Sequence, residues 1–187
     1  MDLSLLAVKL APGLAGGLAA MTLATGAHNL IDNSTPTLTE VGAHCKPTSA
    51  GVVCDSLFDG SQPLYPGAPP ITRTVTLTYQ GSRKAGVGGL YIGSFVSRSA
   101  TSAPLCTAAD PAAGFELSVA ADGQSLYQGS LSDFAAAHSD ASNLLPIRSS
   151  WRSGESVAVT LAVTMPRSAG NEFMGCVSAA DFIWTAE

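Results

Sequence analysis

The residues from Ile71 to Tyr79 constrain the fold most, because threonine alternates there with mostly larger, apolar side chains. Thr72, Thr74, Thr76 and Thr78 occupy every second position. Successive side chains of a β-strand point to opposite faces, so this segment would present one hydroxylated face and one largely apolar face. Threonine, valine and isoleucine also favour strands. The alternation therefore predicts a strand with one face in a protein core.

A second long strand is predicted at residues 156–165, with larger apolar residues on one face and small residues on the other. The apolar face would consist of Val157, Val159, Leu161 and Val163, and the small face of Ala158, Thr160, Ala162 and Thr164. The same reasoning predicts shorter strands at residues 89–97, 115–121, 124–128 and 180–185.

Glycine-containing segments between these strands mark tight reversals of the chain. Asp122-Gly123 would connect two short strands as a hairpin turn. Further turns are predicted at Ser153-Gly154, Gln80-Gly81-Ser82 and Gly170-Asn171. Many short strands joined by such turns predict an all-β sandwich.

One short helix is predicted at residues 131–138. Ser130 or Ser132 would cap its amino terminus, because a serine hydroxyl accepts a hydrogen bond from an unpaired backbone amide of the first turn. Its apolar stripe would consist of Leu131, Phe134 and Ala137.

The composition limits the class of protein. The chain has 187 residues, which suits one domain with a substantial core. Only 12% of the residues are charged and 46% are hydrophobic, with a net charge of −5 and no run of like charges. Such a sequence offers no basic surface for nucleic acid or for an anionic membrane. We therefore expect an extracellular or assembled protein with no nucleic-acid partner.

Four cysteines indicate the compartment. Cys45, Cys54, Cys106 and Cys176 include no CxxC pair and no clustered histidines, which favours disulfides over a zinc site. Cys45 and Cys54 bracket a short, turn-rich segment, so a local bridge between them is the simplest pairing. Cys106 and Cys176 would then join distant segments and stabilise the fold by about 4 kcal/mol in the chain-entropy model. Disulfides predict an oxidising compartment, and four buried thiols are the alternative.

The amino-terminal segment has two interpretations. As a strand, residues 1–10 would carry apolar groups on both faces, and these candidate polymerisation residues are Leu3, Leu5, Leu6, Val8 and Leu10. Such a strand needs burial on both sides, either in its own sandwich or in a neighbouring subunit. Alternatively, residues 1–27 are a signal segment, although prolines and glycines interrupt its apolar run. No apolar stretch reaches the ~20 residues of a membrane helix, so we expect no membrane insertion.

Residues 11–70 are rich in Gly, Pro, Asn, Ser and Thr. This composition predicts long loop insertions with a few strands, held by a bridge between Cys45 and Cys54. Asp55 and Asp59 in this segment lack the dense spacing of a calcium loop, and we interpret them as solubilising residues.

The sequence contains no recognisable catalytic motif. The histidines, the residue type that serves most often as a general base, are His28, His44 and His138, and none lies in a catalytic or metal-binding pattern. His138 is followed closely by Asp140, which we interpret as a solvated helix end rather than a catalytic pair. We therefore expect no enzymatic activity, no cofactor and no metal.

The order of segments in the carboxy-terminal two thirds resembles a known family. The segments that carry the resemblance are Tyr65-Pro66-Gly67, the strand from Ile71 to Tyr79, Gln80-Gly81-Ser82, the corner at residues 166–175 and the closing Trp184-Thr185-Ala186. Together they resemble the TasA/camelysin-type secreted proteins over roughly residues 65–186. The resemblance implies a jelly-roll-like β-sandwich and a subunit of extracellular biofilm fibres. In such fibres an amino-terminal strand of one subunit completes a sheet of the next.

We therefore expect a secreted structural subunit that forms a homopolymer, an extracellular or cell-surface filament of a biofilm matrix. Donor-strand complementation by residues 1–10 would join the subunits. The segment 11–70 and the four cysteines depart from the best-known family members. A cell-surface adhesin or binding module with the same sandwich is one alternative. A camelysin-like metallopeptidase is a weaker one, because three scattered histidines provide no zinc-binding spacing.

Overall fold

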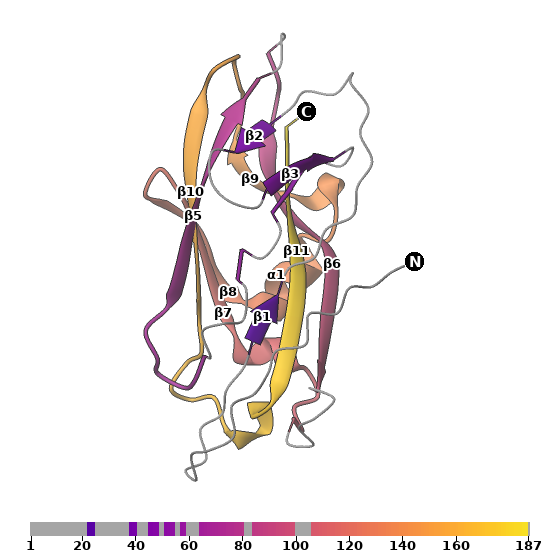
Figure 1. The fold of residues 1–187 in the computed structure, drawn as a ribbon, viewed down its shortest axis with the longest axis vertical. Helices are drawn as coiled ribbons and strands as arrows, with labels where there is room; N and C mark the ends of the chain where they lie inside the picture. The colour runs from indigo at the N-terminus through magenta and orange to yellow at the C-terminus, as the bar shows by residue number, and fades with distance from the viewer. Residues whose placement is uncertain are drawn as a thin grey trace.

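The computed structural model describes residues 22–24, 38–40, 45–48, 51–54, 57–58, 64–80, 84–99 and 106–186. Within these ranges the chain forms two β-sheets that pack face to face, together with one α-helix (Figure 1). The strands are β1 Thr22–Ala24, β2 Leu38–Glu40, β3 Cys45–Thr48, β4 Gly51–Cys54, β5 Ile71–Tyr79, β6 Gly88–Ser99, β7 Glu116–Ala121, β8 Gln124–Ser130, β9 Leu145–Arg148, β10 Ser156–Thr164 and β11 Cys176–Ala186. The predicted all-β sandwich is confirmed.

Each of the two sheets has its own order of strands. The first has the order β3-β4-β11-β6-β9, and β1 pairs with β11 off this path. The second has the order β2-β5-β10-β7-β8. Among the described pairs, β1 and β11 run parallel, whereas the others are antiparallel. Figure 1 shows β1 beside the half of β11 that is farther from the carboxy terminus.

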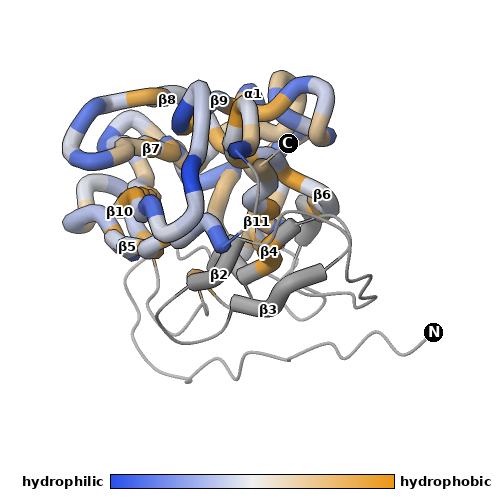
Figure 2. Tube along the Cα trace, turned by 90° about the horizontal axis from the view of Figure 1, so that it is seen from above, coloured by the Kyte–Doolittle hydropathy of each residue, from blue (hydrophilic) through white to orange (hydrophobic). Residues whose placement is uncertain are grey.

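A continuous cluster of buried apolar side chains fills the space between the sheets. The long strands contribute alternate residues to it. Seen from above in Figure 2, β5, β10 and β7 lie on one side of the molecule and β6 and β11 on the other. From β10 these are Val157, Val159, Leu161 and Val163, none of which is more than 4% exposed. Trp151 and Trp184 are fully buried in the same cluster. The apolar face predicted for the strand at residues 156–165 is confirmed.

The outer face of the second sheet carries the small residues. Thr74 lies opposite Thr160, and their hydroxyl oxygens are 3.0 Å apart. Thr78 lies opposite Ser156, with 2.8 Å between the hydroxyl oxygens. Because side chains directly opposite each other share a face, these contacts fix the register of β5 against β10.

The hairpin between β7 and β8 turns at Asp122 and Gly123, as predicted. Both residues have positive φ angles, 47° and 81°, the combination that a type I′ turn requires. The Asp122 carboxylate also accepts a hydrogen bond from the Ala158 amide at 3.0 Å, and the Asp122 amide donates to the Ala158 carbonyl at 2.9 Å. These bonds attach the turn to β10.

The predicted helix forms as α1, Leu131–Ala137, with Ser130 as its cap. The Ser130 hydroxyl accepts a hydrogen bond from the Asp133 amide at 3.0 Å. Leu131 and Phe134 are buried as expected, whereas the prediction for Ala137 was wrong because that residue is exposed. The buried stripe continues instead through Ala135, which packs against the core.

Several elements differ from the prediction in extent. The last strand begins at Cys176 rather than at residue 180, and the small residues of its first half gave a weak pattern. β9 was not predicted, because Pro146 interrupts its strand signal. Proline is tolerated there because β9 is an edge strand, paired with β6 alone. Short 3-10 helices were also not predicted; these are η1 Pro111–Gly114, η2 Ala141–Asn143 and η3 Asn171–Phe173.

Candidate assembly site

The residues predicted to polymerise, Leu3, Leu5, Leu6, Val8 and Leu10, lie outside the described residues. The structure therefore bears on the receiving side of strand donation. A donated strand needs a sheet edge with unpaired backbone groups and a core that is open beside it. Within the described part of the chain, the amino-terminal half of β5 has both features.

Among the described strands, only β2 pairs with β5 on the side away from β10, and it does so over part of the length of β5. β2 pairs with Leu77, Thr78 and Tyr79, and no other described strand pairs with residues 71–76 on that side. β10, in contrast, pairs with β5 from Ile71 to Thr78. One half of the edge of the second sheet is therefore open within the described part of the chain.

The direction of the backbone groups on β5 follows from one pair of hydrogen bonds. The Tyr79 amide donates to the Glu155 carbonyl at 2.9 Å, and the Tyr79 carbonyl accepts from the Gly154 amide at 2.8 Å. Tyr79 thus directs its backbone groups toward the β10 side. Because these directions alternate along an antiparallel strand, Thr72, Thr74 and Thr76 direct theirs toward the open edge.

The core is less well covered beside this open edge. The inner face of β5 consists of Ile71, Arg73, Val75, Leu77 and Tyr79. Val75 and Leu77 are each 1% exposed, whereas Ile71 and Arg73 are only half-buried. Burial along β5 thus decreases toward the end where no described strand pairs on the side away from β10, and an additional strand on that side would extend the burial.

Arg73 is the charged residue on this inner face. It lies opposite the fully buried Leu161 of β10, so its side chain leaves β5 on the core side. Its guanidinium donates to the Thr72 carbonyl at 3.0 Å, at the open edge. Arg73 was not predicted as a candidate site residue, although the sequence shows a charged residue here on an otherwise apolar strand face.

In the first sheet, two short strands among the described residues pair with the edge of β11 away from β6. β4 pairs with Ile183 and Trp184 of β11, and β1 pairs with residues 177–179. On its other side, β11 pairs with β6 along its length, with one irregularity between Ala180 and Phe182. Two short strands of different direction therefore share one edge of the central strand.

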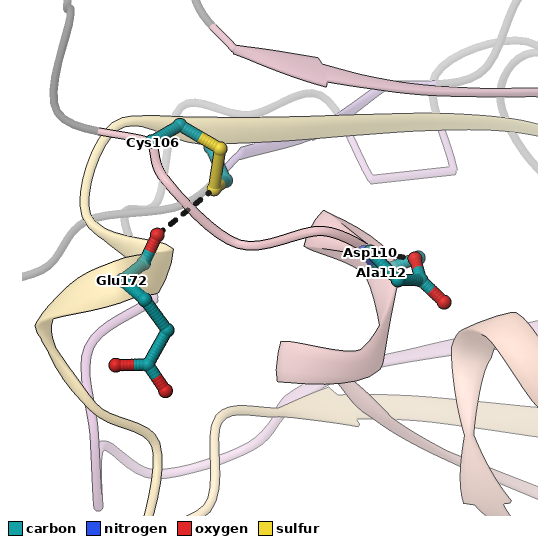
Figure 3. Close-up of a disulfide and its surroundings, with 5 residues drawn as sticks. Cys106, Asp110, Ala112 and Glu172 are labelled. Atoms are coloured by element: carbon teal, nitrogen blue, oxygen red, sulfur yellow. Dashed lines mark hydrogen bonds between the residues drawn. A yellow bond between two sulfur atoms is a disulfide. The ribbon is translucent and has the colours of Figure 1, made fainter.

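A disulfide attaches the start of β11 to the loop before η1. Cys106 and Cys176 are bonded, with Cα atoms 4.8 Å apart, as predicted (Figure 3). The Glu172 carbonyl beside this bridge accepts hydrogen bonds from the Thr107 amide at 2.9 Å and the Ala108 amide at 3.0 Å. The bond and the carbonyl together hold the corner that precedes β11.

The second predicted disulfide stays a prediction. Cys45 and Cys54 lie directly opposite each other in the antiparallel hairpin of β3 and β4. This register is compatible with a bridge, but the side chains of both residues lie outside what the structure describes.

His138 differs from the predicted solvated helix end. Its ring is half-buried, with the Phe134 ring centroid at 4.8 Å and the Tyr127 ring centroid at 6.3 Å. Nδ1 lies 2.6 Å from the Asn143 carbonyl oxygen, so the imidazole connects α1 to η2. Asp140 interacts instead with Ser142, whose amide and hydroxyl donate to its carboxylate at 2.8 Å and 2.5 Å.

No group of three or more His, Cys, Asp or Glu side chains that could hold a metal ion occurs among the described residues. His28, His44, Asp55 and Asp59 lie outside them. No helix in the described part of the chain is long and apolar enough to cross a membrane. Neither a family model nor a curated protein matches the sequence.

Proposed function

We propose that the chain is a secreted structural subunit that polymerises into an extracellular filament of a biofilm matrix by donor-strand complementation. The observation that carries this proposal is the open half-edge of β5, residues 71–76, beside half-buried core residues. A strand inserted there would pair with the backbone of β5 and bury apolar side chains in the same step. Residues 1–10, with apolar groups on both faces, are the proposed donor.

Two further features support the proposal. Strands β4 to β11 follow the orders β4-β11-β6-β9 and β5-β10-β7-β8, which are compatible with the paired Greek keys of a jelly roll. The disulfide between Cys106 and Cys176 supports an oxidising, extracellular location. Because a donor segment and an acceptor edge are different surfaces, their contact is head-to-tail and generates an open polymer.

The proposal is tested by deleting residues 1–9. Because the described core consists of strands from β4 onward, we expect the truncated chain to fold. We also expect it to remain monomeric under conditions where the full chain forms filaments. Negative-stain microscopy and sedimentation measure assembly, and circular dichroism with thermal denaturation measures folding.

The control for this deletion is addition of a synthetic peptide with the sequence of residues 1–10 to the truncated chain. The peptide should bind as a strand and raise the midpoint of thermal unfolding without restoring filaments, because it connects no second subunit. Normal filaments from the truncated chain, or a full chain that stays monodisperse under all conditions tested, would rule out strand donation from this segment.

A further inference from the structure

Arg73 is a cation in an unusual position. It lies on the inner face of β5, is half-buried, and has a hydrogen bond to the carbonyl of its own neighbour, Thr72. No carboxylate in the described part of the chain forms an ion pair with it. A charge at the margin of a core is stabilised most when an opposite charge lies beside it. The guanidinium therefore fits an acidic partner that approaches along the open edge.

We propose that Arg73 is a specificity-determining residue of assembly, whose guanidinium binds the Asp2 carboxylate of the strand that a second copy inserts beside β5. This inference rests on the proposed function. It identifies the residue that selects the incoming strand and the face of that strand that turns toward the core.

The charge pattern of the donor segment supports this pairing. Within residues 1–10, Asp2 is the only acid and Lys9 the only base. In an extended strand Asp2 shares a face with Leu6, Val8 and Leu10, whereas Lys9 lies on the opposite face. If the Asp2 face turns inward, the carboxylate reaches the side occupied by Arg73. If the Lys9 face turns inward, two cations share that side, which is unfavourable.

The same interaction would open the edge for strand pairing. In the described chain the Thr72 carbonyl, which is directed toward the open edge, accepts a hydrogen bond from the Arg73 guanidinium. When the guanidinium moves to the incoming carboxylate, this carbonyl can accept a hydrogen bond from an amide of the donated strand. The exchange replaces a bond from the guanidinium to a neutral carbonyl by an ion pair between the guanidinium and a carboxylate. Arg73 therefore occupies one acceptor of the edge until an acidic strand arrives.

Charge reversal in the full chain tests the proposal. Arg73→Glu and Asp2→Arg should each raise the protein concentration needed for assembly about tenfold or more, because each places like charges together. An equimolar mixture of the two variants should assemble near the wild-type concentration. In the mixture, Asp2 of one variant meets Arg73 of the other, and the introduced arginine meets the introduced glutamate. Arg152→Glu is the matched control and should assemble normally, because Arg152 is exposed in the turn before β10, beside the Tyr79 end of β5.

Sedimentation and negative-stain microscopy give the readout, and recovery in the mixture shows that both variants fold. Normal assembly of Arg73→Glu alone, or a mixture that stays monomeric, would overturn the ion pair. These results leave the proposed function intact as long as the wild-type chain forms filaments and the chain lacking residues 1–9 does not. If the chain lacking residues 1–9 also forms filaments, strand donation itself is wrong.

Discussion

Gly88 illustrates at the residue scale how tightly the sandwich is packed. A Cβ atom at this position would lie 2.1 Å from Nε1 of the fully buried Trp151. We predict that Gly88→Ala lowers the free energy of unfolding by about 1–3 kcal/mol, because the indole cannot move without disturbing the core. Chemical denaturation measures the change, and Ser94→Ala, exposed on the same strand, is the control. An unchanged midpoint for Gly88→Ala would contradict this packing.

The disulfide gives a second residue-scale prediction. Replacing Cys106 and Cys176 together by serine should lower the free energy of unfolding by about 4 kcal/mol, since the bridge closes a long loop in the unfolded chain. Reducing agent should have a similar effect on the wild-type protein. Denaturation with and without reductant tests this, and a double variant with wild-type stability would show that the corner at Glu172 holds by hydrogen bonds alone.

Asp140 provides a prediction about pH. Hydrogen bonds from the Ser142 side chain and backbone lower its pKa below the ordinary value of 3.8. A carboxyl group with a lowered pKa in the folded state stabilises the fold above its ordinary pKa, and this contribution disappears as the pH falls through the lowered value. We predict that Ser142→Ala raises the pKa of Asp140 toward 3.8, measured by NMR titration. An unchanged pKa would assign the shift to the backbone bonds.

At the scale of elements, the sequence predicted those strands whose two faces differ strongly in side-chain size. β5 and β10 were predicted nearly to their ends, because threonine or alanine alternates with larger residues. β9 was missed because it is short and contains Pro146. The proposed acceptor edge was also not predictable, since the half of β5 that no described strand pairs on this side depends on where the neighbouring strands end in space. Its local sequence feature is Arg73, a charged residue on an otherwise apolar strand face.

The open edge of β5 predicts a pattern of hydrogen exchange. The amides of Thr72, Thr74 and Thr76 are directed away from β10, so they should exchange quickly in the monomer and slowly in the filament. The amides of Val75 and Leu77, directed toward β10, should be protected in both states. Hydrogen exchange resolved to single residues measures this, and equally fast exchange of the threonine amides in filaments would place the subunit contact elsewhere.

At the scale of the whole molecule, the described strands pair unevenly with the two ends of the sandwich. β2 and β4 pair with the carboxy-terminal parts of β5 and β11, whereas on the side of β11 away from β6 only β1, among the described strands, pairs with the first half (Figure 1). A head-to-tail contact at the open end would bury apolar surface and remove a sheet edge together. This is the physical reason behind the assembly that we propose, in which residues 1–10 are the proposed donor.

The most direct test is a cross-link between the donor and the acceptor edge of different subunits. Leu5 would lie on the outer face of the donated strand, as Thr72, Thr74 and Thr76 do on β5. Leu5→Cys chains are mixed with chains that carry a cysteine at one of these threonines, assembled, oxidised and separated on a denaturing, non-reducing gel. We predict a covalent dimer in the mixture for at least one threonine position and none for either variant alone. Filaments from every mixture without any covalent dimer would contradict strand donation at β5.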